Sequence, residues 1–490
     1  MFPFGRSVHQ LHKPVGCPFW FAIRRSFVLG LLLSISVGGA TIGCGPTAEP
    51  TSVTGHLSGR ITVNTAVDST ADYSNFRVLV AQGRERQIDT LGHALTMRDG
   101  SFATPVVAPE RGVYLLTVWG RNGRQRLFAT EYVVADADSA RLSVEFPISR
   151  HLVPVRSREN AALLTYRNTM ALHQQALMQR LQQVSYRENA MLQSVRQTSS
   201  ILWDMRATYP DTYATQLASV ESLALLEGWN DSLVVARAAE IAPANPRFGE
   251  AARIGRRAMA RVKGQQAALT FLDDAYTRAQ TDAQKAAVQA TRLRAHLDSL
   301  ERDKALAVAE HIQDAYPDTP WADWADRAAY EAETLLPGMP APDFTVRTIQ
   351  GDTLSLNDLY GRPVLLEFYQ PGEDLYVQQM PTRNALHVAT RPDSVAFLSV
   401  SLQPDTLLNR AFFEGRQLPG QHVIAPGGLE EGMAQTYNVA VVPTRFLIDP
   451  EGRIVDKYVG SALLAVQDDL ANLPPPAQPG SAISPPPSTP

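Results

Sequence analysis

The stretch Val364–Pro381, "VLLEFYQPGEDLYVQQMP", decides how the C-terminal part of the chain folds. Its first six residues are apolar or aromatic except for Glu367, which is typical of a buried strand. Gln-Pro-Gly then predicts a turn. The segment that begins at Glu373 predicts a helix that runs to the Met-Pro at the end of the stretch. Strand-like and helix-like segments alternate from Pro337 to about residue 473, which is typical of an α/β fold.

The length and composition are ordinary for a globular protein of several domains. A chain of 490 residues is long enough for two to four domains, and 44% hydrophobic residues is ordinary for a packed core. The net charge is −4 and the arginines form no basic run, so the sequence gives no reason to expect nucleic-acid binding.

Both cysteines of the chain, Cys17 and Cys44, lie in its first tenth. Residues 45–490 therefore contain no disulfide, no thiolate metal site and no cysteine nucleophile. Any chemistry in that part of the chain must use other side chains.

The N-terminal segment has the pattern of a secretory signal. Two arginines precede the apolar run "SFVLGLLLSISVGGATIG", which ends in small residues before Cys44. "TIGC" resembles a bacterial lipobox without its usual first leucine, so residues 1–44 are expected to be a lipoprotein signal peptide with its lipobox. The resemblance implies cleavage before Cys44 and lipidation of that cysteine, which becomes the mature N-terminus. We expect a lipid-anchored, exported protein of the bacterial cell envelope. A retained transmembrane anchor and a twin-arginine signal are the alternatives.

Three further segments follow the signal before the α/β part. Residues 45–53 are small and polar, which is typical of a tether. From residue 54 to 150, β-branched and aromatic runs such as "FRVLVA" and "GVYLLTVWG" predict a β-sandwich, with a hairpin turn at Asp99-Gly100. Residues 157–335 carry apolar residues at helical spacing and predict an all-α domain.

The helical segment contains an internal echo. Prolines begin similar stretches at Pro210, Pro246 and Pro317, and "TDAQKAAVQA" from Thr281 fills the missing interval. A period of about 36 residues favours stacked helical hairpins, loosely like tetratricopeptide repeats, and a plain helical bundle is the alternative. At the other end of the chain, residues 474–490 are rich in proline and serine, which predicts a disordered tail.

Several motifs in the last third of the chain occur in the order of a known family. They are "PAPDF" at 340–344, a turn glycine at 351, "SLNDL" at 355–359, the strand "RPVLLEFY", and "VAVVPTRFLIDPEGRIVDKYVG". Together they resemble redoxin domains of the AhpC/TSA and TlpA-like types. The resemblance implies a thioredoxin-like fold for residues 337–473, and the whole chain is expected to be multidomain α+β.

The resemblance also assigns roles to single residues. Aligned without a gap, Glu373 takes the position of the attacking cysteine of the family's Cys-x-x-Cys pair, and Tyr376 takes that of the resolving cysteine. Pro443 is expected in cis, between Val442 and Thr444, in a loop that offers backbone groups to an extended substrate. Glu367 lies where many redoxins carry a buried polar residue that assists proton transfer.

A carboxylate and a phenol cannot replace the two thiols. Disulfide exchange needs an attacking thiolate, and peroxide reduction needs a thiolate that becomes a sulfenic acid. We expect Glu373 to cap the helix that follows it. A hydrolytic pair formed by Glu367 and Glu373 is the alternative.

Metal and cofactor sites are not expected. His387 and His422 lack ligand spacing, and no phosphate-binding loop or dinucleotide fingerprint is present. The sequence therefore favours a binding or scaffolding protein whose partner is a protein or an extended peptide. A thiol–disulfide oxidoreductase or peroxidase is the alternative, and a domain that only stabilises its neighbours is a third hypothesis.

Overall fold

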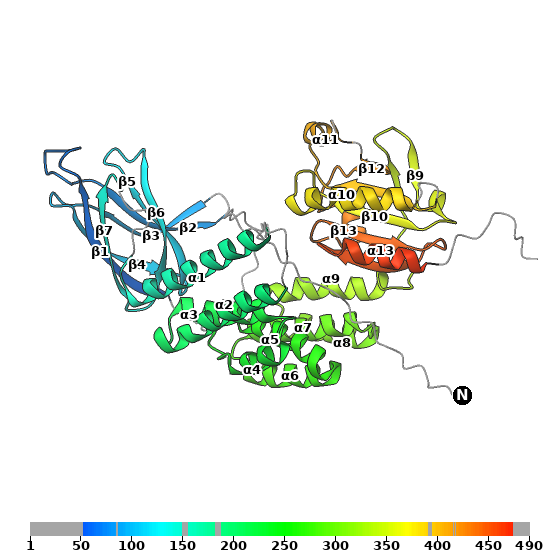
Figure 1. Ribbon diagram of the computed structural model, residues 1–490, viewed down its shortest axis with the longest axis horizontal. Coiled ribbons are helices and arrows are strands. Elements are labelled where there is room, and N and C mark those ends of the chain that lie inside the picture. The colour runs from blue at the N-terminus through cyan, green and yellow to red at the C-terminus, as the bar shows by residue number, and fades with distance from the viewer. Residues whose placement is uncertain are drawn as a thin grey trace, which may run out of the picture. The chain divides into compact units, whose positions relative to one another are not determined.

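The computed structural model describes residues 52–84, 87–148, 155–181, 188–390, 394–414, 416 and 418–473 (Figure 1). They form two compact units that divide between Gln280 and Thr281, inside the segment predicted as helical. The predicted signal with Cys44, and the tail 474–490, lie outside the described residues. Among the described helices, none is both long and apolar enough to cross a membrane.

The first unit begins with two packed β-sheets. One sheet has the order β4-β1-β7 and the other β3-β2-β5-β6, and β1 pairs in parallel with β7. The strands are β1 (Val53–Val63), β2 (Arg77–Arg84), β3 (Gln87–Leu95), β4 (Ser101–Ala108), β5 (Gly112–Trp119), β6 (Arg126–Val134) and β7 (Ser139–Phe146). Their inward side chains form one core that includes Leu57, Ile61, Val80, Val106, Leu116 and Leu142.

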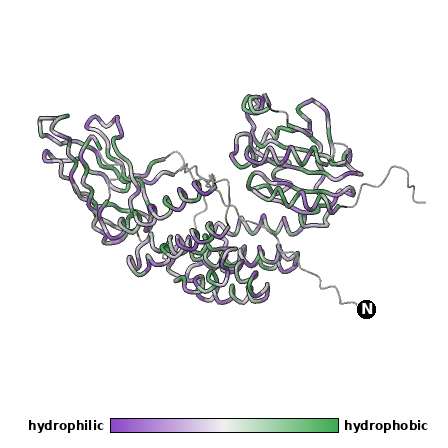
Figure 2. Tube along the Cα trace, in the orientation of Figure 1, coloured by the Kyte–Doolittle hydropathy of each residue, from purple (hydrophilic) through white to green (hydrophobic). Residues whose placement is uncertain are grey.

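In β4 and β7 every second residue is buried, as expected for a sheet that packs one face on the core and exposes the other to solvent. In β4 the side chains of Phe102, Thr104, Val106 and Ala108 are buried, and the residues between them are exposed or half-buried. Hydrophobic and hydrophilic residues accordingly intermix along the tube in this part of the chain (Figure 2).

The hairpin predicted at Asp99-Gly100 is wrong. β3 and β4, which flank this turn, belong to different sheets, and β4 pairs with β1 instead. The turn itself is tight: Gly100 has φ +83°, and a Cβ there would lie 2.0 Å from the carbonyl oxygen of Ile61. Asp-Gly chemistry thus marks a real turn, but the hydrophobic faces of the two strands decide that it joins two sheets.

Helices follow the sandwich. The first unit contains α1 (Arg158–Leu181), α2 (Glu188–Thr208), α3 (Tyr213–Leu226), α4 (Asp231–Glu240), α5 (Phe248–Lys263) and α6 (Gln265–Arg278). The second unit begins with α7 (Asp282–Asp298), α8 (Arg302–Ala315) and α9 (Pro320–Thr334). The similar stretches that recur about every 36 residues lie where α3, α5, α7 and α9 begin. This sequence repeat therefore marks the start of every second helix.

Local chemistry explains how these helices begin. Thr281 and Gln284 form a capping box at the start of α7, where each side chain binds the other residue's backbone N–H. Pro320 occupies the first turn of α9, where the missing N–H costs nothing.

The C-terminal part of the second unit has a thioredoxin-like fold, as the motif order predicted. Its central sheet has the order β12-β11-β10-β13-β14, with β10, β11 and β12 parallel and β13 and β14 antiparallel to their neighbours. The elements are the β8–β9 hairpin (Thr345–Arg347, Thr353–Ser355), η1 (Asn357–Leu359), β10 (Val364–Tyr369), α10 (Asp374–Ala389), β11 (Ala396–Ser401), α11 (Thr406–Phe413), β12 (Gln421–Ile424), α12 (Met433–Thr436), β13 (Thr444–Ile448), β14 (Ile454–Val459) and α13 (Leu463–Asn472).

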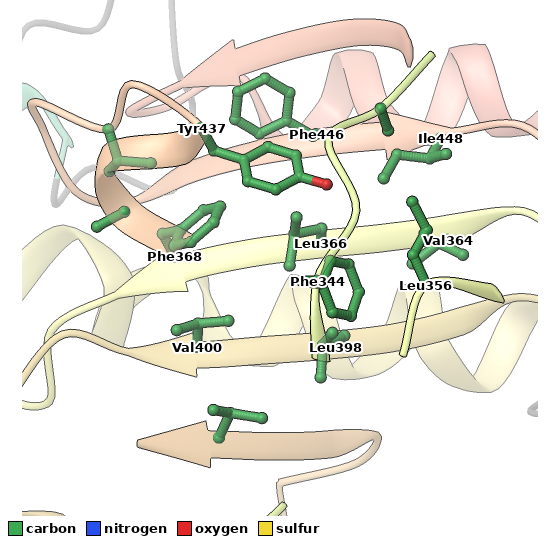
Figure 3. Packing of buried hydrophobic residues seen from close by; sticks show 14 of the residues in the cluster. Phe344, Leu356, Val364, Leu366, Phe368, Leu398, Val400, Tyr437, Phe446 and Ile448 are labelled. Carbon is green, nitrogen blue, oxygen red and sulfur yellow. The ribbon is translucent and has the colours of Figure 1, made fainter. Parts of the chain in front are cut away.

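The two faces of this sheet carry separate cores. On one face, Leu366 and Phe368 of β10 pack with Phe446, Tyr437 and the segment that begins at Phe344 (Figure 3). On the other face, apolar side chains of β10, β11 and β13 pack beneath α10 and α13. Successive side chains of β10 point to opposite faces, so Glu367 and Tyr369 lie on the face covered by α10.

Replacing Gly59 by alanine should destabilise the β-sandwich. A Cβ at Gly59 would lie 1.8 Å from the backbone oxygen of Leu142 on the paired strand β7, so the backbones must move apart. We expect the free energy of unfolding to fall by about 1–3 kcal/mol, as for other overpacked sites. Urea denaturation followed by circular dichroism measures the change.

Gly83→Ala is the matched control, because a Cβ at Gly83 meets no atom within 4 Å. Equal stability of the two variants would contradict the close approach of β1 and β7.

Candidate functional site

The candidate site lies where β10 ends and α10 begins. The turn from Gln370 to Gly372, with Gly372 at φ +82°, joins the two elements. Thr444 of β13 pairs with Phe368 of β10, which places Pro443 at this same edge of the sheet. The structure thus brings Glu373, Tyr376, Glu367 and Pro443 into one region, whereas Cys44 lies outside the described residues.

Glu373 caps helix α10. Its Oε1 accepts a hydrogen bond from the backbone N–H of Leu375 at 3.1 Å, and its Oε2 accepts one from Tyr376 at 2.6 Å. A carboxylate is favoured here because the first N–H groups of a helix have no partner within the helix and the helix dipole attracts negative charge. Both oxygens of Glu373 are therefore engaged in holding the start of the helix.

Tyr376 is a packed core residue. Its ring stacks on that of Tyr369, with centroids 4.3 Å apart, and lies 6.3 Å from the ring of Phe412. Only 1% of the residue is exposed, and its hydroxyl donates to Oε2 of Glu367 at 3.3 Å. Burial, together with the nearby Glu367 carboxylate, raises the pKa of the Tyr376 phenol far above its usual value, so the phenol stays protonated.

Glu367 is the centre of a buried ion network. Arg383 of α10 donates from Nε to its Oε2 at 2.8 Å, and Arg445 of β13 donates from Nε to its Oε1 at 2.7 Å. Ser399 of β11 donates to Oε2 at 3.1 Å. Arg383, Arg445 and Glu367 are each at most 1% exposed. One carboxylate thus ties three neighbouring strands and a helix together.

The charges in this network explain the acidity of Glu367. Burial alone would raise the pKa of the carboxyl, but the guanidinium groups of Arg445 and Arg383 outweigh it and lower the pKa to about 2. Arg383 is satisfied further by the carbonyl of Pro419 at 3.0 Å and by Ser399 at 2.8 Å. With two guanidinium groups and one carboxylate, the network carries one excess positive charge.

Sequence reasoning missed both arginines. Each was visible as a charged residue in an otherwise apolar setting: Arg445 lies inside "TRFLI", and Arg383 lies seven residues after Tyr376, two helical turns along the same face. A buried carboxylate such as Glu367 needs a buried cation as its partner. That requirement could have pointed to these two arginines.

The loop that ends at Pro443 presents free backbone groups. The Val442–Pro443 peptide bond is cis. The carbonyl of Pro443 accepts from the N–H of Gly460 at 2.8 Å, and that of Val441 accepts from the hydroxyl of Thr444 at 2.6 Å. Within the part of the chain that the structure describes, neither the N–H nor the C=O of Val442 has a hydrogen-bond partner.

Two exposed valines border these free groups. Val441 is 55% exposed in the loop, and Val459, which lies at the end of the edge strand β14, is 47% exposed. Val459 pairs with Thr444, next to Pro443. An apolar rim with free backbone donors and acceptors is suited to an added extended segment.

The histidines supply no catalytic group here. His422 is buried with Nε2 3.1 Å from the carbonyl oxygen of Leu418, and burial and the nearby Arg383 charge lower the pKa of His422 to about 4. The ring of His387 packs edge-on against Phe397. Among the described residues, no group of three or more His, Cys, Asp or Glu side chains could hold a metal ion.

Comparison with known proteins places this domain in a family. The AhpC/TSA family model matches residues 337–457. Over 126 residues the chain is 32% identical to the thioredoxin-like protein YneN of Bacillus subtilis (strain 168), which covers 25% of this chain and 72% of that protein. It is 28% identical over 130 residues to the thiol-disulfide oxidoreductase ResA of Bacillus cereus (strain ZK / E33L). That match covers 26% of this chain and 73% of ResA.

A solved thiol-disulfide oxidoreductase from Bacteroides fragilis NCTC 9343 is 24% identical, and the match covers 27% of this chain and 98% of that one with a TM-score of 0.25. The matches to the family model and to YneN identify the class: the chain belongs to the AhpC/TSA family of thioredoxin-like redoxin proteins through its C-terminal domain.

Replacing Glu367 by glutamine should strongly destabilise the second unit. The substitution keeps the shape of the side chain but leaves Arg383 and Arg445 buried without a counter-charge. Removing one partner of a buried ion pair costs about 3–5 kcal/mol. Urea denaturation of the variant measures this loss. Glu430→Gln, which removes an exposed carboxylate of the same unit, should change the free energy of unfolding little.

The same pair of proteins tests the pH dependence. The folded-state pKa of Glu367 is below the ordinary value of 4.5, so its contribution is complete above about pH 4.5 and is lost as the pH falls toward about 2. The difference in free energy of unfolding between wild type and Glu367→Gln should shrink across that window. A difference that stays constant from neutral to acidic pH would contradict the ionised network.

Proposed function

We propose that this chain is a redox-inactive member of its family that acts as a binding or scaffolding protein. The observation that carries the proposal is how Glu373 and Tyr376 are bound at the positions where the family has its two cysteines. Both carboxylate oxygens of Glu373 accept hydrogen bonds from backbone N–H groups at the start of α10, and Tyr376 is buried in an aromatic stack. Neither side chain presents a reactive atom at the edge of the sheet.

The chemistry of the family supports the same conclusion. Thiol–disulfide exchange proceeds through a mixed disulfide, and peroxide reduction proceeds through a sulfenic acid. Residues 45–490 contain no thiol, which both reactions require. The relatives named above include a thiol-disulfide oxidoreductase, and this activity is the rival hypothesis for the chain.

A hydrolytic site at Glu367 is not favoured either. A general acid or base needs a pKa near the working pH and access to the reacting group. Glu367 has a pKa of about 2, both of its oxygens are hydrogen-bonded, and it is 1% exposed. The network therefore supports a structural role for this carboxylate.

The binding role rests on the loop at Pro443. The N–H and C=O of Val442 can pair with the backbone of an extended segment, which would lie beside the sheet as an added strand. Such pairing needs no cysteine. The partner class is therefore a protein or peptide segment in extended conformation, and no cofactor is required.

The place of action in this proposal is the bacterial cell envelope. The apolar run and "TIGC" support export, cleavage before Cys44 and lipidation of that cysteine. The lipid would then tether the β-sandwich to a membrane through residues 45–53, with the redoxin domain presented to the compartment outside the cytoplasm.

The mature protein should reduce no disulfide. In an insulin-reduction assay with dithiothreitol, and in a coupled peroxide-consumption assay, we expect the rate to equal that of a heat-denatured sample. The variant Glu373→Cys/Tyr376→Cys places two thiols one helical turn apart and should form a disulfide on oxidation. Thiol titration before and after oxidation measures it, with Tyr376→Cys alone as the control.

Two outcomes separate the claims. Activity of the unmodified protein above the denatured sample would refute the redox-inactive proposal. A double-cysteine variant that folds but forms no disulfide would instead refute the gapless alignment, and the inactivity would stand.

The substitution Cys44→Ser should abolish lipidation, because the hydroxyl cannot form the thioether. We expect the variant to lose incorporation of labelled fatty acid and to accumulate as an unprocessed precursor, as measured by metabolic labelling and mass spectrometry of membrane fractions. Cys17→Ser should be processed like the wild type. A lipid-labelled, processed Cys44→Ser product would show that the lipobox interpretation is wrong.

A further inference from the structure

A pocket of about 160 Å³ lies beside the Pro443 loop, within the second unit. One wall comes from helices α7 and α9, and the other comes from the loop and from strand β14. Its lining includes Arg294, Trp324, Arg327, Val441, Lys457 and Val459. The two exposed valines that border the free backbone of Val442 are thus also part of this pocket.

Two hydrogen bonds and an ion pair hold helix α9 against the redoxin domain and so define the pocket. The hydroxyl of Tyr330 donates to the carbonyl of Thr436 at 2.8 Å, and the amide of Asn438 donates to the carbonyl of Arg327 at 2.9 Å. Lys457 and Glu331 form an ion pair at 2.7 Å, with side chains only 15% and 13% exposed. The helix is therefore a fixed wall of the pocket.

The charges of the pocket are unbalanced. Three cations, Arg294, Arg327 and Lys457, line it with a single acid, Glu331. Glu331 is already engaged by Lys457 at 2.7 Å and by Arg294 at 3.2 Å, and Arg294 also contacts Asp298 outside the lining at 2.9 Å. Arg327 forms no ion pair with any residue that the structure describes. The pocket thus has an excess of positive charge with one free guanidinium.

The walls of the pocket suit a side chain with an apolar stem and a charged end. Trp324, Val441 and Val459 offer apolar surface, and Arg327 offers several N–H donors in a planar fork that matches a carboxylate. In an extended segment alternate side chains point to the same side. A segment paired at Val442 would therefore direct every second side chain toward Val441 and the pocket.

We propose that this pocket accepts an acidic side chain, glutamate or aspartate, of the extended segment bound beside Pro443. The inference rests on the proposed function, because backbone pairing at Val442 holds the segment in place. It adds the selectivity of the site: an acidic peptide is preferred over a neutral one of equal length. The selectivity comes from helices α7 and α9, which lie before the redoxin domain in sequence.

The test uses a set of fluorescent, capped heptapeptides of alternating threonine and valine. One series carries glutamate at each successive position, and a matched series carries glutamine. Fluorescence anisotropy with the mature protein measures the dissociation constant of each peptide. We expect glutamate at one alternate set of positions to tighten binding by about two- to fivefold over glutamine, the size of an ion pair with an exposed arginine. Added salt should reduce this preference.

Variants separate the pocket from a general charge effect. Arg327→Gln should remove the preference for glutamate and leave the affinity for the glutamine peptides unchanged. Arg302→Gln, which removes an arginine of α8 whose side chain is 48% exposed, is the matched control and should keep the preference. N-methylation of a peptide bond at the centre of the peptide should weaken both series, because it removes a backbone donor.

Each negative result has a distinct meaning. If no peptide of either series binds at millimolar concentration, the proposed binding function is overturned and the pocket inference falls with it. If both series bind equally, only the acidic preference is overturned and the binding function stands. Equal weakening of both series by Arg327→Gln would also overturn the acidic preference, since the arginine would then act through the structure alone.

Discussion

The redoxin domain of this chain depends on one buried carboxylate. Glu367 lies in the middle of the central strand and receives hydrogen bonds from Arg383 on the covering helix and Arg445 on the next strand. An ion in an apolar layer is costly unless its partners reach it with good geometry, and here every oxygen of the carboxylate is paired. The position of α10 over the sheet and the register of β13 against β10 are both tied to this group.

The same network lies beside Glu373 and Tyr376, the two residues that take the places of the family's cysteines in the gapless alignment. A redoxin needs a reactive group at the start of the helix and a proton acceptor beneath it. In this chain the helix start is closed by the Glu373 cap, the space beneath is filled by the stacked rings of Tyr369 and Tyr376, and Glu367 is neutralised by two guanidinium groups. The two positions that align with the family's cysteines thus carry a helix cap and a stacked aromatic ring, both of which stabilise the fold.

The proposed binding function rests on the loop at Pro443. Loops often carry function, because a rigid sheet positions them and leaves some of their backbone groups unpaired. The loop at Pro443 keeps this property, and helices α7 and α9 add a charged wall next to it. The proposed binding function needs only unpaired backbone groups and complementary shape and charge at this loop, and it needs no reactive side chain.

The sequence by itself determined the features that depend on neighbouring residues. The absence of cysteine from residue 45 onward excluded thiol chemistry, the glycine at 351 and the helical turn at 355–359 marked real turns, and the order of motifs identified the thioredoxin-like fold. The cap at Glu373 was also predictable, because a cap acts within its own helical turn.

Only the tertiary structure decided the contacts between distant segments. Arg383 and Arg445 reach Glu367 across 16 and 78 residues of chain, and the tie between Asn438 and Arg327 spans 111. The Asp99-Gly100 turn shows the same limit: its local chemistry was correct, but the pairing of β4 with β1 was not visible in it. Strand pairing and buried charge depend on which faces meet in the folded core, and no short stretch of sequence contains that information.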